Sequence, residues 1–364
     1  MANANRDIST ITGEISLIGP KDSFIENIDT NIELIKLRIK KDLNIEYLNI
    51  GTITNTKIAI ISINNITKKE LINNIKNQLN KINIDGLIDS SYVKRNLEIK
   101  EQLFPTIMTT ERPDKACMAL LEGKVIILVE NSPYALIMPS FFIDFFHTTD
   151  DYYQKSTHVS FIRIIRVFAF LISILLPAIY ISVTTRNYDL VPIDLLLMLK
   201  AGRSFVPFPA YIEAIFMIIC FEILKECDIR MSSTNASSIS ILGGLILGDA
   251  AVSAGIVSPI MIIIIALSSI SGMIFPSQEF VNVTRFYKIL LLFLSSFLGI
   301  LGVLIGLIIL INNLIHTKMF NYKYLTPFIP LDKNEIKDTI IRIDEDNLTR
   351  NSILTNNKKR GKIR

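Results

Sequence analysis

Residues 237–276, SSISILGGLILGDAAVSAGIVSPIMIIIIALSSISGMIFP, are the stretch that decides the fold of this chain. The stretch is too apolar for a soluble domain, yet glycines, an aspartate and a proline interrupt its aliphatic run. Inside a bilayer every backbone N–H and C=O needs an internal partner, so a broken helix persists there only beside protein or a water-filled cavity. The stretch therefore predicts a broken helix within a membrane bundle, next to a pathway for a polar species.

The composition on either side divides the chain into a polar part and an apolar part. The 364 residues are 50% hydrophobic, and the mean hydropathy is +0.42. Charged and Asn-rich sequence dominates up to about His158, and Ile, Leu and Phe runs fill about Phe161 to Ile315. We predict an α+β cytoplasmic N-terminal region of two small subdomains, followed by an α-helical transmembrane bundle. The predicted domains are a disordered N-terminus (1–12), two α/β subdomains (13–85 and 86–157), a transmembrane helical domain (158–316) and a basic cytoplasmic tail (317–364).

Both ends of the chain are expected in the cytoplasm. The N-terminus, MANANRDIST, carries no apolar stretch behind a charged one, so it does not resemble a cleaved signal peptide. Three cysteines without a C-x-x-C pair fit a reducing compartment. The C-terminal KKRGKIR from Lys358 is interpreted as a positive flank on the inner side or as a contact for anionic lipid.

Apolar spacing predicts the elements of the polar part. Apolar residues three and four apart predict amphipathic helices over 24–40 and 68–82, and β-branched runs predict strands over 43–50 and 57–63. Pro113 and Gly123 bracket a further helix. KVIILVE and YALIMP read as a hairpin, and residues 84–98 as a connector between the subdomains. Aromatic residues from Phe141 onward either stack on a ligand or pack at the membrane surface.

Length divides the apolar part into four crossings, because a spanning helix needs about 20 apolar residues. The predicted crossings are 161–184, 205–224, 239–275 and 289–315. The third is too long for a straight helix and should break near Gly248-Asp249 or near Pro259. Residues 185–203 contain VPIDLLLML, which is too short to cross and is assigned to the outer interface or to a re-entrant segment. Arg163 and Arg166 begin the first crossing as a cytoplasmic flank.

Acidic side chains in these apolar segments are the first candidates for function. Charges are costly in lipid and mark ion pathways by default, which singles out Glu213, Glu222 and Asp249. Two alternatives stay open, since Glu222 lies next to interfacial charges and Glu213 can form a buried pair with Arg203.

Small residues are the second group of candidates, because they let helices approach closely. Residues 244–251 are predicted to line a pore. The pore and gating candidates are Glu213, Gly244, Leu247, Gly248, Asp249 and Ala251. In the fourth crossing, small residues recur on one helical face and are predicted to pack helices within or between subunits: Ser295, Gly299, Gly302 and Gly306.

Several runs resemble the A subunit of GerA-type spore germinant receptors. They include GEISLIGPKDSFIENIDTNIELIKLRI from Gly13, FPTIMTTERPDKACMALLEGKV from Phe104, VPFPAYIEAIFMIICFEILKE from Val206 and GLILGDAAVSAGIVSP from Gly244. The resemblance is collinear from about Gly13 to Asp332. The related SpoVAF-like accessory proteins share the pattern, and the motifs do not separate the two groups.

The resemblance implies a multi-pass subunit in the inner membrane of a dormant spore. Its implied partners are a transporter-like B subunit, which senses the germinant, and a lipoprotein C subunit. It further implies a homo-oligomer, with a pentamer as the expected assembly, whose membrane segments release monovalent cations and contact membrane lipid. A secondary transporter and a structural scaffold are the alternatives.

Enzymatic function is not expected. The sequence contains no P-loop, H-E-x-x-H or G-x-S-x-G motif. Its three histidines are far apart and show no ligand spacing, and we expect no metal, cofactor or nucleic acid.

Overall fold

The chain, a computed structural model, is described at residues 13–14, 17–230, 244, 248–331, 336, 338–342 and 354–355. It divides into two compact units, which are treated one at a time. Unit 1 comprises Met1–Ile165 and Asn313–Arg364, and unit 2 comprises Arg166–Asn312. The first helix and the last helix of unit 2 both continue into unit 1.

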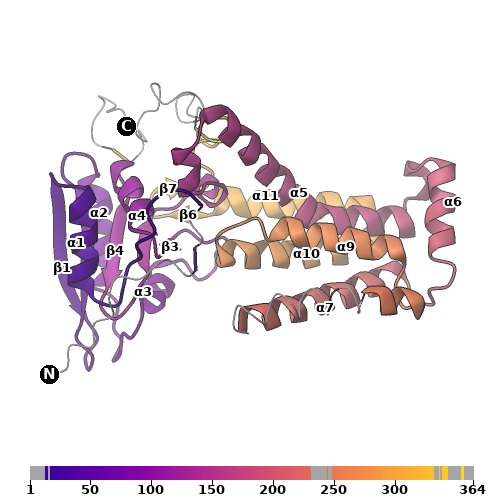
Figure 1. The fold of residues 1–364 in the computed structure, drawn as a ribbon, viewed down its shortest axis with the longest axis horizontal. Coiled ribbons are helices and arrows are strands. Elements are labelled where there is room, and N and C mark those ends of the chain that lie inside the picture. Colours follow the sequence, from indigo (N-terminus) through magenta and orange to yellow (C-terminus); the bar gives the residue numbers. More distant parts are fainter. Residues whose placement is uncertain are drawn as a thin grey trace. The chain divides into compact units, whose positions relative to one another are not determined.

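Unit 1 contains the α+β part of the protein (Figure 1). Its elements, in chain order, are α1 (Ile28–Arg38), β1 (Leu43–Ile50), β2 (Thr56–Ile63), α2 (Lys69–Leu79), α3 (Ser90–Leu97), β3 (Met108–Thr110), α4 (Pro113–Leu121), β4 (Val125–Val129), β5 (Ala135–Met138), the 3₁₀ turns η1 (Phe142–Phe146) and η2 (Thr149–Tyr153), the start of α5 (Ser156–Thr185), and the short strands β6 (Lys318–Met319) and β7 (Tyr322–Lys323). The predicted helices, strands and hairpin are confirmed at nearly the predicted places.

The two predicted subdomains are wrong as separate bodies, because their strands form one sheet. The strand order is β1-β2-β4-β5-β3, and all four pairings are antiparallel. Ile58 lies opposite Val129 and Ile61 opposite Ile126, so the second half of the polar part pairs directly with the first. Both β2 and β4 are apolar on both faces, and such strands are most stable in the middle of a covered sheet. The predicted connector also contains helix α3, which packs against β5.

The segment after residue 316 is part of unit 1 and not a separate tail. Tyr324 is 1% exposed, and its ring packs against Phe104 and Phe142 with centroids 5.8 and 6.0 Å apart. The aromatic cluster from Phe141 onward is therefore part of this core. Lys358 lies outside the described residues.

Arg163, predicted as a cytoplasmic flank of the first crossing, is buried within unit 1. Its side chain is 1% exposed and lies 2.8 Å from Asp338 and 3.3 Å from Asp151. Its Nη1 donates to the carbonyl of Thr339 at 3.1 Å. The arginine thus fastens the start of α5 to the segment 338–342, because a buried guanidinium requires carboxylate and carbonyl acceptors.

All regular elements described in unit 2 are helices or 3₁₀ turns. It contains most of α5, the 3₁₀ turn η3 (Tyr188–Leu190), α6 (Ile193–Gly202), α7 (Ala210–Arg230), α9 (Pro259–Gly272), α10 (Gln278–Leu298) and α11 (Ile300–His316). Helices α5 and α10 are long and apolar enough to cross a membrane, while α9 and α11 are apolar but shorter.

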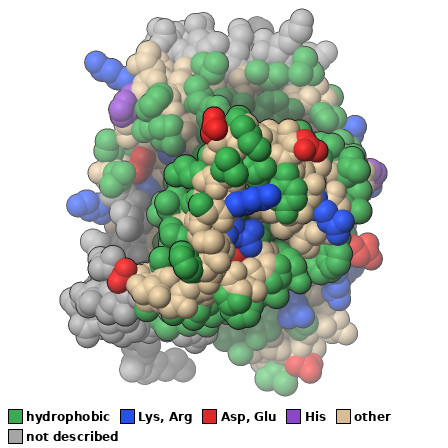
Figure 2. All heavy atoms as spheres, turned by 90° about the vertical axis from the view of Figure 1, so that its right-hand side faces the viewer, with side chains coloured by type: hydrophobic (Ala, Val, Ile, Leu, Met, Phe, Trp, Pro, Cys, Tyr) green, Lys and Arg blue, Asp and Glu red, His purple; other side chains and the backbone are tan. Residues whose placement is uncertain are grey.

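Helix α6 is formed by the apolar residues that were predicted to lie between the first two crossings. None of its residues is buried, and it runs across the direction of the other helices of unit 2 (Figure 1). Hydrophobic side chains surround a few charged ones at the end of the unit that carries α6 (Figure 2). An exposed apolar helix of ten residues fits an interfacial position.

The predicted fourth crossing is wrong, because the chain reverses at Gly299. Gly299 has φ +63° and caps α10, and Asn187 Oδ1 accepts a 2.9 Å hydrogen bond from the N–H of Ile300. Helix α11 then packs back against α10, with Gly302 against the backbone of Leu294 and Gly306 against the side chain of Leu291. Residues 289–315 were read as one helix because a single glycine in the positive-φ region does not interrupt an apolar run.

Candidate functional site

The break predicted in residues 237–276 lies between residue 253 and Pro259, the second of the two predicted places. Residues 248–253 are helical, and α9 begins at Pro259. Gly255 makes the turn with φ +66°, and a Cβ there would lie 3.0 Å from the carbonyl oxygen of Phe205. Ser258 caps α9 through its side chain, with Pro259 in the first turn. Both the positive φ and the close backbone approach require glycine at residue 255.

Glu213 holds this break together from the first turn of α7. Its carboxylate is buried. Its Oε1 accepts hydrogen bonds from Arg203 Nη2 at 2.8 Å and Nε at 3.2 Å. Its Oε2 accepts a 3.0 Å bond from the N–H of Ser258. We call these three residues the Glu213 clamp.

The clamp is electrostatically well matched on both sides. Arg203 neutralises the carboxylate, and the partial positive charge at the N-terminus of α9 favours a negative group beside Ser258. The arginine side chain remains 19% exposed, while that of Glu213 is 0% exposed. The geometry thus agrees with the alternative in which Glu213 forms a buried pair with Arg203. Every acceptor atom of the carboxylate has a protein partner, so the clamp positions helices.

The other pore candidates differ in exposure, since Gly244 and Gly248 are half-buried, Asp249 is exposed and Ala251 is buried. A Cβ added at Gly244 or at Gly248 would have no described atom within 4 Å, and Asp249 is exposed. Ala251 is 6% exposed and belongs to a buried apolar cluster with Met217 and other residues of α7, α9 and α10. Leu247 lies outside the described residues.

The small residues predicted for helix packing do not share one helix. Ser295 is buried in the last turn of α10, Gly299 makes the turn, and Gly302 and Gly306 lie in α11. Both glycines of α11 face α10 at distances that leave no space for a side chain. They therefore pack two helices of one subunit.

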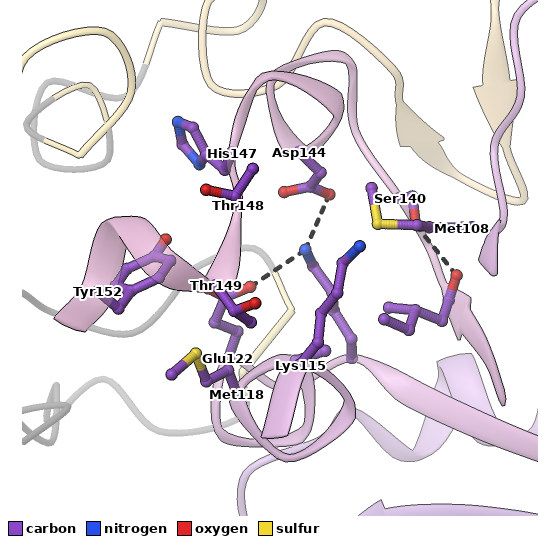
Figure 3. Close-up of a pocket in the computed structure, with 13 residues that line it drawn as sticks. Met108, Lys115, Met118, Glu122, Ser140, Asp144, His147, Thr148, Thr149 and Tyr152 are labelled. Carbon is purple, nitrogen blue, oxygen red and sulfur yellow. Dashed lines mark hydrogen bonds and ion pairs between the residues drawn. The ribbon is translucent and has the colours of Figure 1, made fainter. Parts of the chain in front are cut away.

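A charge network in unit 1 was missed as a site. Lys124 precedes strand β4 and is 5% exposed, and its Nζ lies 2.8 Å from Asp144 and 3.1 Å from Glu122. Burial would lower the pKa of Lys124, but the two carboxylates outweigh it and raise that pKa. Burial raises the pKa of Glu122. Figure 3 shows Glu122 and Asp144 on the two sides of the shared ammonium group.

A cavity of about 60 Å³ adjoins this lysine. Its polar lining includes Lys115, His147 and Tyr152 (Figure 3). Lys115 pairs with Glu14 at 3.3 Å, and His147 Nε2 lies 2.8 Å from the carbonyl oxygen of Thr339. The charge of Lys124 is balanced by Glu122 and Asp144, so this network joins the start of β4 to η1.

A second buried network begins at Arg112, which is 3% exposed. Its guanidinium lies 2.8 Å from Asp114 and 3.2 Å from Asp150. Burial alone would raise the pKa of Asp114, but the hydrogen bonds and charge of Arg112 hold it below its ordinary value. The sequence signal for both networks was the pair of runs TERPD and LLEGKV, where charges adjoin buried elements.

The described residues contain no group of three or more His, Cys, Asp or Glu side chains that could hold a metal ion. Cys117 is buried in α4, while Cys220 and Cys227 lie on α7. Burial raises the pKa of the Cys117 thiol to about 12, which makes a thiolate at this position unfavourable.

Comparison with known sequences and structures gives consistent matches. The family described as "Bacillus/Clostridium GerA spore germination protein" matches residues 2–352. Spore germination protein KA of Bacillus subtilis is 36% identical over 93% of this chain and 62% of its own length. Spore germination protein GerQA of Bacillus cereus is 34% identical over 98% and 72%, and the uncharacterized membrane protein YfkQ of Bacillus subtilis is 34% identical over 93% and 66%.

A solved structure, the N-terminal domain of the A subunit of the Bacillus megaterium spore germinant receptor GerK3, is also similar in sequence. It is 37% identical, covers 33% of this chain and 97% of that one, and superposes with a TM-score of 0.28. This chain spans less than two thirds of the length of spore germination protein KA.

Proposed function

Because this chain belongs to the GerA family of spore germination proteins, we propose that it acts in spore germination as the A-type subunit of a nutrient-germinant receptor. In this proposal unit 2 is embedded in the inner membrane of the spore as a multi-pass bundle. Unit 1 lies in the cytoplasm with both termini. The apolar helices α5 and α10 support the membrane assignment.

We further propose that unit 2 oligomerises, with a pentamer as the expected assembly, and encloses a path for monovalent cations. The observation that carries this proposal is the environment of the residues before the break. Asp249 is exposed, and a Cβ at Gly244 or Gly248 would meet no described atom within 4 Å, while the following Ala251 is packed inside. Small residues permit close approach of neighbouring copies, and a ring of carboxylates at Asp249 would favour cations.

The Glu213 clamp supplies a physical basis for gating. It joins the N-termini of α7 and α9 to the loop after α6 through three hydrogen bonds to one carboxylate. A rotation of α7 therefore moves the break, and with it the helix that ends at residue 253. In the proposed assembly, a transporter-like B subunit senses the germinant, and the C subunit is a lipoprotein.

The experiment measures early monovalent-cation release from spores that lack this chain and are complemented with variants. Asp249→Lys should reduce the release, because it reverses the charge on the proposed path, and Gly248→Leu should reduce it by filling the same region. Asp249→Glu keeps the charge and should release cations like the wild type. Asp194→Lys is the matched control, since it makes the same charge change on the exposed face of α6.

Normal release from the Asp249→Lys and Gly248→Leu strains, at normal protein level, would contradict the conducting path. Normal release from the deletion strain would instead favour a SpoVAF-like accessory role or a structural scaffold. A secondary transporter would show substrate counterflow in reconstituted vesicles, and a conducting oligomer would not.

A further inference from the structure

A second polar pocket lies within unit 2, away from the Glu213 clamp. It has a volume of about 60 Å³ and is formed by α5, α7, α9 and α10. Its charged lining consists of Glu222 and Lys225 from α7 and of Arg285 and Lys288 from α10. A pocket between apolar helices with this charge content requires an explanation, because ionic groups are costly there.

The charges in this pocket do not balance. Glu222 is the one carboxylate in the described lining, and it lies 2.8 Å from Arg285. Lys288 is 6% exposed, and no hydrogen bond or ion pair joins it to any described residue. The Nε atom of Arg285 is likewise buried without a partner among the described residues. Three cationic side chains thus line the pocket beside one carboxylate, and that carboxylate pairs with Arg285, so Lys288 has no ion-pair partner in the described lining.

The surroundings indicate what kind of anion fits. The helices that form the pocket also carry exposed apolar side chains: Ile219 and Ile223 on α7, Ile270 on α9, Phe286 and Ile289 on α10, and Met273, which caps α9 and lines the pocket. A soluble anion would leave these apolar side chains in contact with water, whereas a phospholipid covers them with acyl chains. The volume also admits a group larger than one water molecule, which needs about 10–15 Å³.

We propose that this pocket binds the phosphate group of an anionic phospholipid. Arg285 and Lys288 hold the phosphate oxygens, and Lys225 contributes charge at the edge. Basic pockets between membrane helices are suited to anionic head groups. A lipid with net negative charge fits better than a zwitterionic lipid, because the head group of a zwitterionic lipid already carries a positive charge next to its phosphate. Bound lipid would join α7 to α10 in addition to the Glu222–Arg285 pair.

The absence of tryptophan from the chain makes a direct test possible. Phe286→Trp places a single fluorophore next to the pocket on a side chain that is 48% exposed. The full-length protein is reconstituted in phosphatidylcholine bilayers that contain either brominated phosphatidylglycerol or brominated phosphatidylcholine. We expect phosphatidylglycerol to quench the tryptophan preferentially at equal mole fraction.

Substitutions in the Phe286→Trp background test the side chains. Lys288→Gln should lower the preference for the anionic lipid about fivefold, the effect of one basic group near an anionic head group. Lys200→Gln, which removes an exposed lysine on α6, should leave it unchanged. Lys225 is partly exposed, so Lys225→Gln provides a second variant if the buried substitution disturbs folding.

Equal quenching by both lipids would overturn the proposal, as would an unchanged preference in both pocket variants. Relief of the quenching by millimolar inorganic phosphate, without any preference between the lipids, would assign the pocket to a soluble anion and would also overturn it. The assay measures no ion flux, so its result is independent of the channel proposal.

Discussion

The reversal at Gly299 can be tested by adding one methyl group to the neighbouring helix. In Gly302→Ala, the new Cβ would overlap the backbone carbonyl of Leu294 in α10. A backbone atom cannot rotate away as a side chain can, so α10 and α11 must separate. The change therefore acts on the packing of the helical hairpin and on nothing outside it.

The magnitude follows from two opposing effects. Overpacking of a close-packed interior costs about 1–3 kcal/mol, and a backbone clash belongs at the upper end of that range. Alanine is favoured over glycine within a helix by about 1 kcal/mol. The net loss for Gly302→Ala is about 2 kcal/mol, which corresponds to about 4–8 °C in Tm for a unit of this size.

The assay is thermal unfolding of the purified full-length protein in detergent, followed by circular dichroism. Gly306→Ala should lose less, because its Cβ meets the end of the flexible Leu291 side chain. Gly202→Ala is the matched control, since the nearest described atom to its Cβ is the end of the Ile260 side chain at 3.6 Å, an ordinary contact distance. That control should keep the wild-type Tm or exceed it.

A Tm of Gly302→Ala equal to that of Gly202→Ala would refute the reasoning. It would mean that α11 does not pack against α10 and that residues 289–315 form the continuous helix expected from their apolar run. If Gly306→Ala instead lowers the Tm more than Gly302→Ala does, the closest approach of α11 to α10 lies one turn farther along α11.

Three further outcomes are expected. Glu213→Ala should lower the free energy of unfolding by about 1–3 kcal/mol, because it leaves the buried N–H of Ser258 and the partly exposed guanidinium of Arg203 without their shared acceptor. Asp249→Asn at an exposed position should cost less than about 1 kcal/mol in the same denaturation series. Asp114 has a folded-state pKa below its ordinary value, so its contribution to stability is present above the ordinary value and is lost as the pH falls through the lowered pKa. The free energy of unfolding of Asp114→Asn should therefore fall less steeply than that of the wild type below about pH 4. The same dependence on pH in both proteins would contradict the network. Iodoacetamide at pH 8 should alkylate the exposed Cys227 well before Cys117, because burial raises the pKa of the Cys117 thiol to about 12. Mass spectrometry of timed samples measures the two rates. Equal rates would mean that α4 opens readily.

Most elements of unit 1 were predictable because each depends on local spacing. The stripe that became α1, the runs that became β1 and β2, and the Pro113 and Gly123 brackets of α4 all reflect periodicity or backbone preference. Of the two places predicted for the break in residues 237–276, Pro259 agrees with the structure and Gly248-Asp249 does not, since residues 248–253 are helical.

The sequence by itself thus determined the family, the polar and apolar parts, and the type of nearly every element, because these follow from residues close together in the chain. The tertiary structure alone decided which strands pair, that Tyr324 completes the core of unit 1, and that Glu213 bonds to Arg203 and Ser258. It also decided that residues 289–315 fold back at Gly299. These features depend on contacts between residues that are distant in the chain. Whether a charge is buried, and how much space lies beside a glycine, depends on the element that packs against it, so the sequence around the residue carries no signal for it.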